Sequence, residues 1–176
     1  MFEYTEYELQ KRRHKQELIR NEFETAGKYQ IPLIRKQDID LDTINLIGYS
    51  DTKRDDKENA YKTVHFFTYD WFFDKVYENA ADLAKKLRQY YALLSPDFSM
   101  FTDMPKALQI YSVFKNRWCG AYWQSLGLRV IPTISWGIKA VLNFVLTGWN
   151  KEQQSPFAHI IERIVRRNLC SVIIAC

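Results

Sequence analysis

The chain contains little cysteine, and its three cysteines follow no recognisable pattern. Cys119, Cys170 and Cys176 are odd in number and lack the short paired spacing of a zinc site. We therefore expect neither a disulfide framework nor a structural zinc ion, and a reducing cytoplasm is the favoured compartment. The opening run MFEYTEYELQKRRHKQ is charged throughout and does not resemble a secretory signal peptide.

Long apolar runs and charge of one sign are also missing. Residues 134–149 come closest to a membrane-spanning helix, but they contain Lys139 and fall short of the roughly 18 residues required. The net charge is +4, yet the first 137 residues carry 20 basic and 19 acidic side chains. Because that body is nearly neutral, it gives nucleic-acid binding little support.

The familiar catalytic motifs are absent as well. The sequence has no Walker loop and no GxGxxG, HExxH or GxSxG motif. His65 lies inside a predicted strand, where a core position is expected rather than a catalytic one. No cofactor and no metal ligand can be assigned, and whether the protein is an enzyme stays open.

What the chain does have is the size of one domain and an alternation of strands and helices. Of its 176 residues, 47% are hydrophobic, which suits a globular core. After a polar loop at 51–62, the pattern predicts strands at 63–67, 91–95 and 129–136 and helices at 74–89 and 105–126. This alternation predicts an α/β domain over residues 31–137 with a parallel sheet, either open or forming a partial barrel.

The N-terminal segment, residues 1–30, does not show the alternation of strands and helices that follows it. Residues 3–24 have a thin apolar stripe among mixed charges, which predicts a charged helical arm. Such an arm is either solvated or binds a protein partner, and we place the candidate partner-binding segment at residues 1–26. Its basic run KRRHK is surrounded by acids, so phosphate contact is the less favoured reading.

Polar residues follow the predicted strands, where ligands bind in parallel α/β folds. Asp70 follows the first strand, and Asp97 and Ser99 follow the second. Carboxylates at such an edge can hold a metal ion or act as acid and base. Asp70 and Asp97 are therefore candidate catalytic residues. The alternative is a turn or capping role, which we also expect for Asp103 at the start of the long helix.

The long helix carries two further sets of side chains. Its core stripe is predicted to comprise Ala107, Leu108, Tyr111, Phe114, Trp118, Ala121 and Tyr122. On another face, Asn116, Arg117 and Gln124 are candidate ligand-binding residues for an anion or a planar molecule. Ser99 and, at the end of the third strand, Trp136 are further candidate ligand-binding residues. The alternative is that they anchor a loop or a neighbouring helix. Gly120 indicates close packing, and Cys119 is expected in the core.

Several of these stretches resemble one known family. They are IPLIR, SPDFSMFTDMPKALQIY, the Asn116–Arg117 pair, AYWQ, Gly127 and VIPTISWG. Together they are similar to the domain of unknown function family numbered forty-four seventeen, which occurs in bacteria, phages and mobile elements. The resemblance covers about residues 30–137 and implies a cytoplasmic α/β protein of phage or mobile-element type. It implies no particular activity, cofactor or catalytic residue.

The tail departs from that resemblance. Family members continue with a segment like FEFCFDG and a strand like VAV, whereas this chain continues IKAVLNFVLTGWNKEQQSPFAHI. One base added before the codon for Ile138 allows the same bases to read DKSSFEFCFDGLEQGTTVAV. We therefore expect residues 138–176 to be out of frame and the domain to be truncated. The alternative is a genuine basic amphipathic helix that docks on the core or on a membrane surface.

Three functional readings follow from the sequence. The first is a phage-type protein with a small-ligand or metal site at the carboxyl ends of the strands. The second is a non-enzymatic interaction module that acts through the N-terminal helix. The third is an inactive, truncated product of a frameshifted gene.

Overall fold

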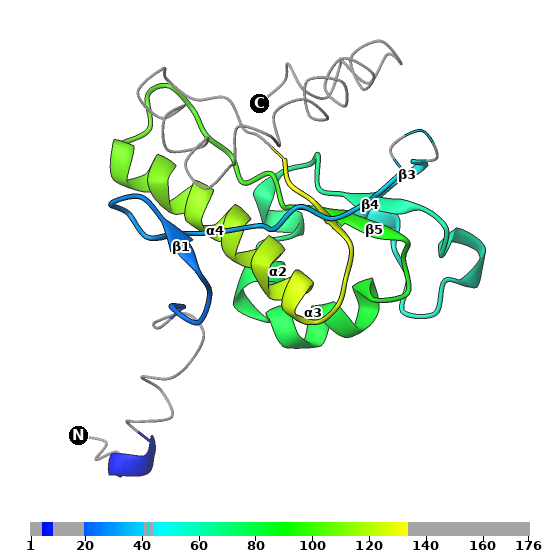
Figure 1. Cartoon of the computed structure of the whole chain (residues 1–176), viewed down its shortest axis with the longest axis horizontal. Coiled ribbons are helices and arrows are strands. Elements are labelled where there is room, and N and C mark those ends of the chain that lie inside the picture. The colour runs from blue at the N-terminus through cyan, green and yellow to red at the C-terminus, as the bar shows by residue number, and fades with distance from the viewer. Residues whose placement is uncertain (1–4, 9–19, 41, 43, 134–176) are drawn as a thin grey trace.

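The structure is a computed structural model that describes residues 5–8, 20–40, 42 and 44–133. A short antiparallel pair, β1 and β2, precedes a four-stranded parallel sheet and the helices that join its strands (Figure 1). The strands are β1 (Thr25–Ala26), β2 (Ile31–Pro32), β3 (Leu46–Gly48), β4 (Thr63–His65), β5 (Ala92–Leu94) and β6 (Val130–Ile131). The α-helices are α2 (Lys75–Glu78), α3 (Ala80–Leu87) and α4 (Lys106–Ser125), with short 3-10 turns at Tyr49–Asp51, Lys57–Asn59 and Asp70–Phe72.

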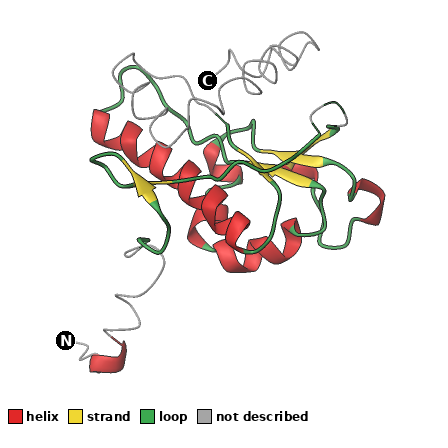
Figure 2. Cartoon of the chain, in the orientation of Figure 1, coloured by secondary structure: helices red, strands yellow, loops and turns green. Residues whose placement is uncertain are grey.

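The order of strands in the large sheet is β3-β4-β5-β6, and all three pairings are parallel. The predicted α/β fold with a parallel sheet is therefore confirmed. Crossovers between parallel strands are right-handed, so a sheet whose neighbours follow chain order carries its helices on one face. Figure 2 shows the helices grouped beside the strands in this way. β3 and β6 lie at the two edges of the described sheet.

The main core lies between the sheet and these helices. Alternate strand residues point to that side, and Val64, Leu93 and Val130 meet apolar side chains of α2, α3 and α4 there. The rings of Phe66 and Trp123 stack at the centre, 5.6 Å apart. The opposite sheet face is buried too, because Ile39 and Ile44, in the segment before β3, pack against Ala92, Leu94 and Ile131.

The β1–β2 hairpin packs on α4. Gly27 sits in its turn with φ 68°, a conformation that favours glycine. Beyond β2, Ile34 fills the space over Gly120, where an added Cβ would lie 2.8 Å from Ile34 Cγ1. The close packing predicted for Gly120 is confirmed, and the buried position of Cys119 agrees with its predicted core role.

The predicted core stripe of α4 is partly wrong. Leu108 and Tyr111 are about half exposed, whereas Gln109, Asn116 and Trp123 on the other face are buried. The reason is that the loops after β5 and β6 offer hydrogen-bond partners to polar side chains on the inner face. Two boundaries also differ: Asn79 separates α2 from α3, and β3 lies just before the polar loop.

Asp103 does not cap α4, contrary to prediction. The N-cap residue is Pro105, and no side chain bonds the first turn. Instead, the Gln109 side chain donates to the carbonyl of Met104 at 2.7 Å. The turn that precedes the helix is thus held from inside the helix rather than by an acidic cap.

Residues 6–8 are helical, whereas residues 20–24, the end of the predicted helix, are not. Residues 9–19 lie outside the described part. The Arg20 guanidinium is buried between the rings of Tyr77 and Trp118, 3.5 and 3.8 Å from their centroids. Arg20 is therefore packed on the domain, whereas residues 5–8 are exposed. No helix among the described residues is long and apolar enough to cross a membrane.

The outer edge of β6 is covered at its start by one side chain. The Gln37 amide accepts a hydrogen bond from Val130 N at 2.8 Å and donates one to the Leu128 carbonyl at 3.1 Å. These are the backbone groups that a further strand would use. Gln124 holds this segment in place, since its amide bonds both the N–H and the carbonyl of Arg35.

Candidate functional site

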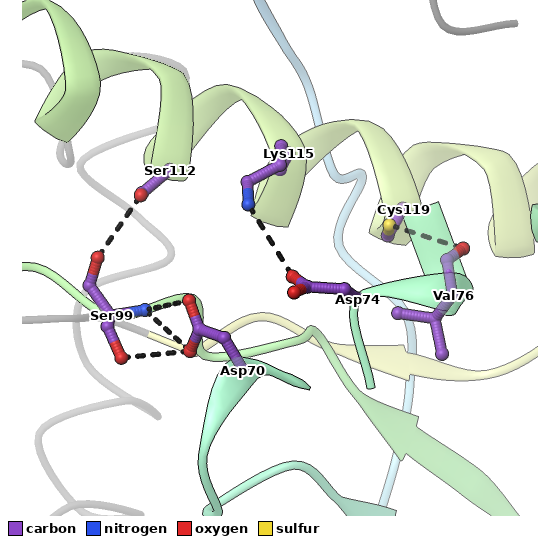
Figure 3. Close-up of polar contacts among 7 residues, drawn as sticks. All are labelled: Asp70, Asp74, Val76, Ser99, Ser112, Lys115 and Cys119. Atoms are coloured by element: carbon purple, nitrogen blue, oxygen red, sulfur yellow. Dashed lines mark hydrogen bonds and ion pairs between the residues drawn. The ribbon is translucent and has the colours of Figure 1, made fainter. Parts of the chain in front are cut away.

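The carboxyl ends of β4 and β5 are joined through Asp70 and Ser99. The Asp70 carboxylate accepts hydrogen bonds from Ser99 N at 3.1 Å and from Ser99 Oγ at 2.8 Å (Figure 3). The Ser112 hydroxyl of α4 in turn donates to the Ser99 carbonyl at 3.1 Å. The sequence correctly placed Asp70 and Ser99 at one edge. Their mutual bonds make them a connection between two loops.

A second contact at this edge involves Asp74, one turn after Asp70. Its carboxylate lies 3.9 Å from Lys115 Nζ on α4, as Figure 3 shows. Burial raises the pKa of Asp74; Lys115 opposes the rise, and the nearby carboxylates of Asp70 and Glu78 add to it. Negative charge is therefore concentrated around the start of α2.

Asn116 and Arg117 belong to a separate buried network between the loops that follow β5 and β6. Asn116 Nδ2 donates to the Pro96 carbonyl at 2.7 Å and to Thr133 Oγ1 at 2.9 Å. Thr133 N donates to Ser95 Oγ at 2.7 Å, and Thr133 Oγ1 donates to the Ser95 carbonyl at 2.9 Å. The network fixes the spacing of the two strand ends.

Arg117 completes this network. Its Nη1 donates to Asn116 Oδ1 at 3.3 Å and to the Thr133 carbonyl at 3.2 Å. Burial lowers the pKa of Arg117 to about 10, so the guanidinium stays charged at neutral pH. The structure thus brings Asn116 and Arg117 together, as predicted, in contacts typical of an anchor for loops.

The remaining predicted site residues lie apart from these two networks or outside the described residues. Gln124 is near the C-terminal end of α4, where it binds the segment at Arg35. Asp97 is half-buried in the loop after β5, and its proposed catalytic role stays a prediction. Trp136 and the tail from residue 138 lie outside the described residues.

A metal site at this edge gains no support from the geometry. Among the described residues, no three His, Cys, Asp or Glu side chains come together in a way that could hold a metal ion. The Asp70 carboxylate accepts hydrogen bonds from Ser99. Any ligand site in the described part must therefore be sought where polar groups face an open space.

Such a space lies beside β3, the other edge strand. An open pocket of about 630 Å³ runs along this strand and is bounded by the β3–β4 connection. Its lining is mostly polar, with two lysines and one carboxylate. The residues that line it are Leu46, Ile47, Gly48, Ser50, Asp51, Thr52, Lys53, Asn59 and Lys62.

The wall of this pocket is rigid although it contains no α-helix. Gln89 accepts a hydrogen bond from Asp56 N at 2.8 Å and donates to the Lys53 carbonyl at 2.6 Å. Tyr90 donates its hydroxyl to Asp56 at 2.9 Å. Burial alone would raise the pKa of Asp56, but hydrogen bonds from Asn59 and Tyr90 outweigh it, and the net pKa is lowered.

Gly48 lines the pocket at the end of β3. Its φ of −66° and ψ of 142° suit any residue, so backbone geometry does not require glycine here. A Cβ at this position would lie 3.1 Å from Asp51 Oδ2, 3.5 Å from Ser50 Oγ and 3.7 Å from His65 Cε1. A carboxylate, a hydroxyl and an imidazole therefore come close to this glycine.

His65 borders the same point. Its Nδ1 accepts a hydrogen bond from Phe67 N at 3.3 Å, and burial lowers its pKa while Asp51 opposes the shift. The ring is therefore neutral at pH 7 with its proton on Nε2. Sequence reasoning missed this pocket because its residues lie in a stretch that reads only as a polar loop. The signal that could have found it was Gly48 at a strand end followed by Ser50 and Asp51.

Comparison with known proteins gives the following matches. A model of the Domain of unknown function (DUF4417) matches residues 23–158. The Gene 1 protein of Mycobacterium phage L5 is 36% identical over 130 residues, which cover 74% of this chain and 56% of that protein. The Gene 1 protein of Mycobacterium phage D29 is 40% identical over 85 residues, 48% of this chain and 32% of that protein. This chain thus spans about half the length of these curated relatives or less, and no solved structure matches it.

Proposed function

Because the chain belongs to the DUF4417 family and resembles two phage Gene 1 proteins, we propose that it is a phage-type protein that binds a small ligand at the sheet edge. The proposal keeps the predicted ligand site at the strand ends but moves it from β4 and β5 to β3. The observation that carries it is the mostly polar pocket beside β3, where Ser50, Asp51 and His65 come close to Gly48. Gly48, Ser50 and Asp51 lie at the carboxyl end of β3, where ligands of parallel α/β proteins bind. Lys53 and Lys62 border the pocket near the amino ends of β4 and β5.

The charges of the lining indicate the class of ligand. Lys53 and Lys62 supply two cations that can bind a phosphate group, while Asp51, Ser50 and Asn59 can bind hydroxyl groups. A volume of about 630 Å³ lies in the range of small-molecule sites. The proposed ligand is a small phosphate monoester with a hydroxylated body.

A titration with ribose 5-phosphate tests the proposal, with inorganic phosphate and ribose titrated separately. Binding is followed by calorimetry and by the chemical shift of the Gly48 amide. We expect ribose 5-phosphate to bind more tightly than either part. The double substitution of Lys53→Gln and Lys62→Gln should lower its affinity by about tenfold or more, because two charge-assisted contacts are lost.

The matched control is Lys57→Gln, an exposed lysine of the same connection that does not line the pocket. It should leave affinity unchanged. Gly48→Ala should weaken binding while the protein stays folded, since the added Cβ would lie 3.1 Å from Asp51 Oδ2 and displace that carboxylate. Equal binding of ribose 5-phosphate and phosphate, or an equal loss in Lys57→Gln, would overturn the proposal.

The N-terminal interaction reading remains a second proposal, and the structure sharpens its test. Deletion of residues 1–26 would remove Arg20 from between Tyr77 and Trp118 and also remove β1. The suitable deletion is therefore residues 1–19, which leaves these contacts in place. Loss of partner capture with an unchanged melting temperature would support an interaction arm.

The frameshift reading is tested on the DNA. The matched family region extends on both sides of Gly137, and a change of frame there stays a hypothesis. Sequencing the gene across the codons for residues 136–146 decides it. An added base that restores DKSSFEFCFDG and an open frame beyond the present stop would favour a damaged gene. Absence of such a frame would contradict it.

A further inference from the structure

Three aromatic side chains are exposed on the turn that follows β4. Tyr69, Trp71 and Phe72 are 61%, 69% and 55% exposed, and we call them the aromatic turn. The rings of Tyr69 and Trp71 are stacked in parallel, 4.4 Å apart, and Phe72 lies 5.8 Å from Trp71. Large apolar side chains gathered in this way on a surface mark an interaction site more often than they serve stability.

The aromatic turn is held in a fixed conformation. Phe72 N donates to the Tyr69 carbonyl at 3.0 Å, and Asp70 is bound by Ser99 from the neighbouring loop. The next residue, Phe73, is fully buried and packs on Phe66 and Phe98. The backbone that carries the exposed rings is therefore fixed. Little conformational entropy would be lost on ordering it when a partner binds.

Acidic side chains outnumber basic ones around the aromatic turn, where the cations include Lys75 and Lys115. Asp70 lies within it, and Asp74 and Glu78 follow on the next turns. The charges of Asp70 and Glu78 act on Asp74, and the only cation paired with Asp74 among the described contacts is Lys115. A polyanion such as nucleic acid is disfavoured here, whereas a cationic partner is electrostatically complementary.

The protein already uses this chemistry internally. The Arg20 guanidinium lies against the rings of Tyr77 and Trp118, and Lys115 Nζ lies 3.9 Å from the ring centroid of Phe98. In both cases an aromatic ring binds a cation that comes from another segment. The exposed faces of Tyr69 and Trp71 offer the same kind of contact to an outside group.

We propose that the aromatic turn is a docking surface for a basic segment of another protein, in which an arginine stacks on Tyr69 or Trp71 beside Asp74. Apolar side chains next to that arginine would cover Phe72. The proposal concerns a surface separate from the pocket beside β3 and does not depend on it.

A synthetic peptide of alternating arginine and leucine serves as the probe, and the same peptide with glutamate in place of arginine is the comparison. Binding is measured by the change in tryptophan fluorescence and confirmed by calorimetry. We expect only the arginine peptide to bind. Trp71→Ala should weaken it by about tenfold, the usual loss for a central aromatic contact. Asp74→Asn should weaken it by less and reduce its dependence on salt.

Tyr61→Ala is the matched control, because Tyr61 is 60% exposed but lies in the β3–β4 connection. It should leave peptide binding unchanged, and Trp71→Ala should leave ribose 5-phosphate binding unchanged. Equal binding of the two peptides, or equal losses in Tyr61→Ala and Trp71→Ala, would overturn the proposal. So would dimerisation of the wild type in ultracentrifugation that Trp71→Ala abolishes, since a second copy would then cover the aromatic turn.

Discussion

The two ends of the sheet's carboxyl edge are both polar, but they differ in how their polar groups are used. At the β5–β6 end, Asn116, Arg117 and Thr133 bond one another and the strand ends. At the β3 end, Ser50 and Asp51 lie close to Gly48 and line the pocket. The first arrangement builds the fold, and the second leaves side chains available to a ligand.

This difference shows that polar residues after a strand do not by themselves identify a binding site. A buried polar group costs free energy unless it finds a partner, so interior positions select side chains that bond each other. Residues around a pocket keep part of their bonding capacity for a ligand. The contrast predicts that substitutions at one end mainly change stability, whereas those at the other mainly change binding.

The largest effect on stability is expected for Asn116→Ala. It removes the donors to Pro96 and Thr133 and the acceptor for Arg117, all in a buried site. We expect the free energy of unfolding to fall by about 2–4 kcal/mol, measured by urea denaturation. Asn116→Asp keeps the acceptor for Arg117 and should lose less. A loss below about 0.5 kcal/mol for the alanine variant would contradict an anchoring role.

A smaller effect is expected for Asp70→Ala, which disconnects the loops after β4 and β5. The site is only partly buried, so solvent reduces the cost to about 1–2 kcal/mol. Asp70→Asn keeps one acceptor oxygen for Ser99 and should recover part of the loss. Chemical denaturation of the three proteins gives the comparison. An unchanged midpoint in both variants would argue against a connecting role and return Asp70 to the list of candidate catalytic groups.

The smallest effect concerns His65, which stands beside the open end of the edge. Its pKa is lowered in the folded protein, mainly by burial, so the unfolded chain binds a proton first as pH falls below about 6.5. The stabilisation is fully present above that pH and is lost toward the lower folded pKa. Urea denaturation at several pH values between 5 and 7.5 should show this decline in the wild type. His65→Gln should show a smaller decline, and equal slopes would exclude a contribution from His65.

Much of the fold could be predicted from the sequence because its signals are local. The apolar run at 63–67, the alternation after it and the glycine at Gly127 mark β4, α4 and the approach to β6. Parallel pairing follows from that alternation. The pairing of Asp70 with Ser99 was also foreseeable, because the ends of neighbouring parallel strands meet at one edge.

The inner face of α4 could not be predicted, because it depends on groups far away in the chain. Leu108 and Tyr111 look like core residues by spacing, but Asn116 and Arg117 are buried because carbonyl groups at Pro96 and Thr133 receive them. The same limit applies to β3 and its pocket. β3 has only three residues, which is too few to show the alternation of apolar and polar residues typical of a strand. It forms because β4 pairs with it.

The side chain of Gln37 has a consequence for self-assembly. By bonding Val130 N and the Leu128 carbonyl, one amide occupies the positions that an incoming strand needs at the start of β6. A strand from a second copy of the protein can pair with the start of β6 only after the Gln37 side chain has moved away. Yet removing it requires no change in the core. Gln37 therefore blocks strand addition at this point of the edge, and its loss would expose backbone groups that can pair with another strand.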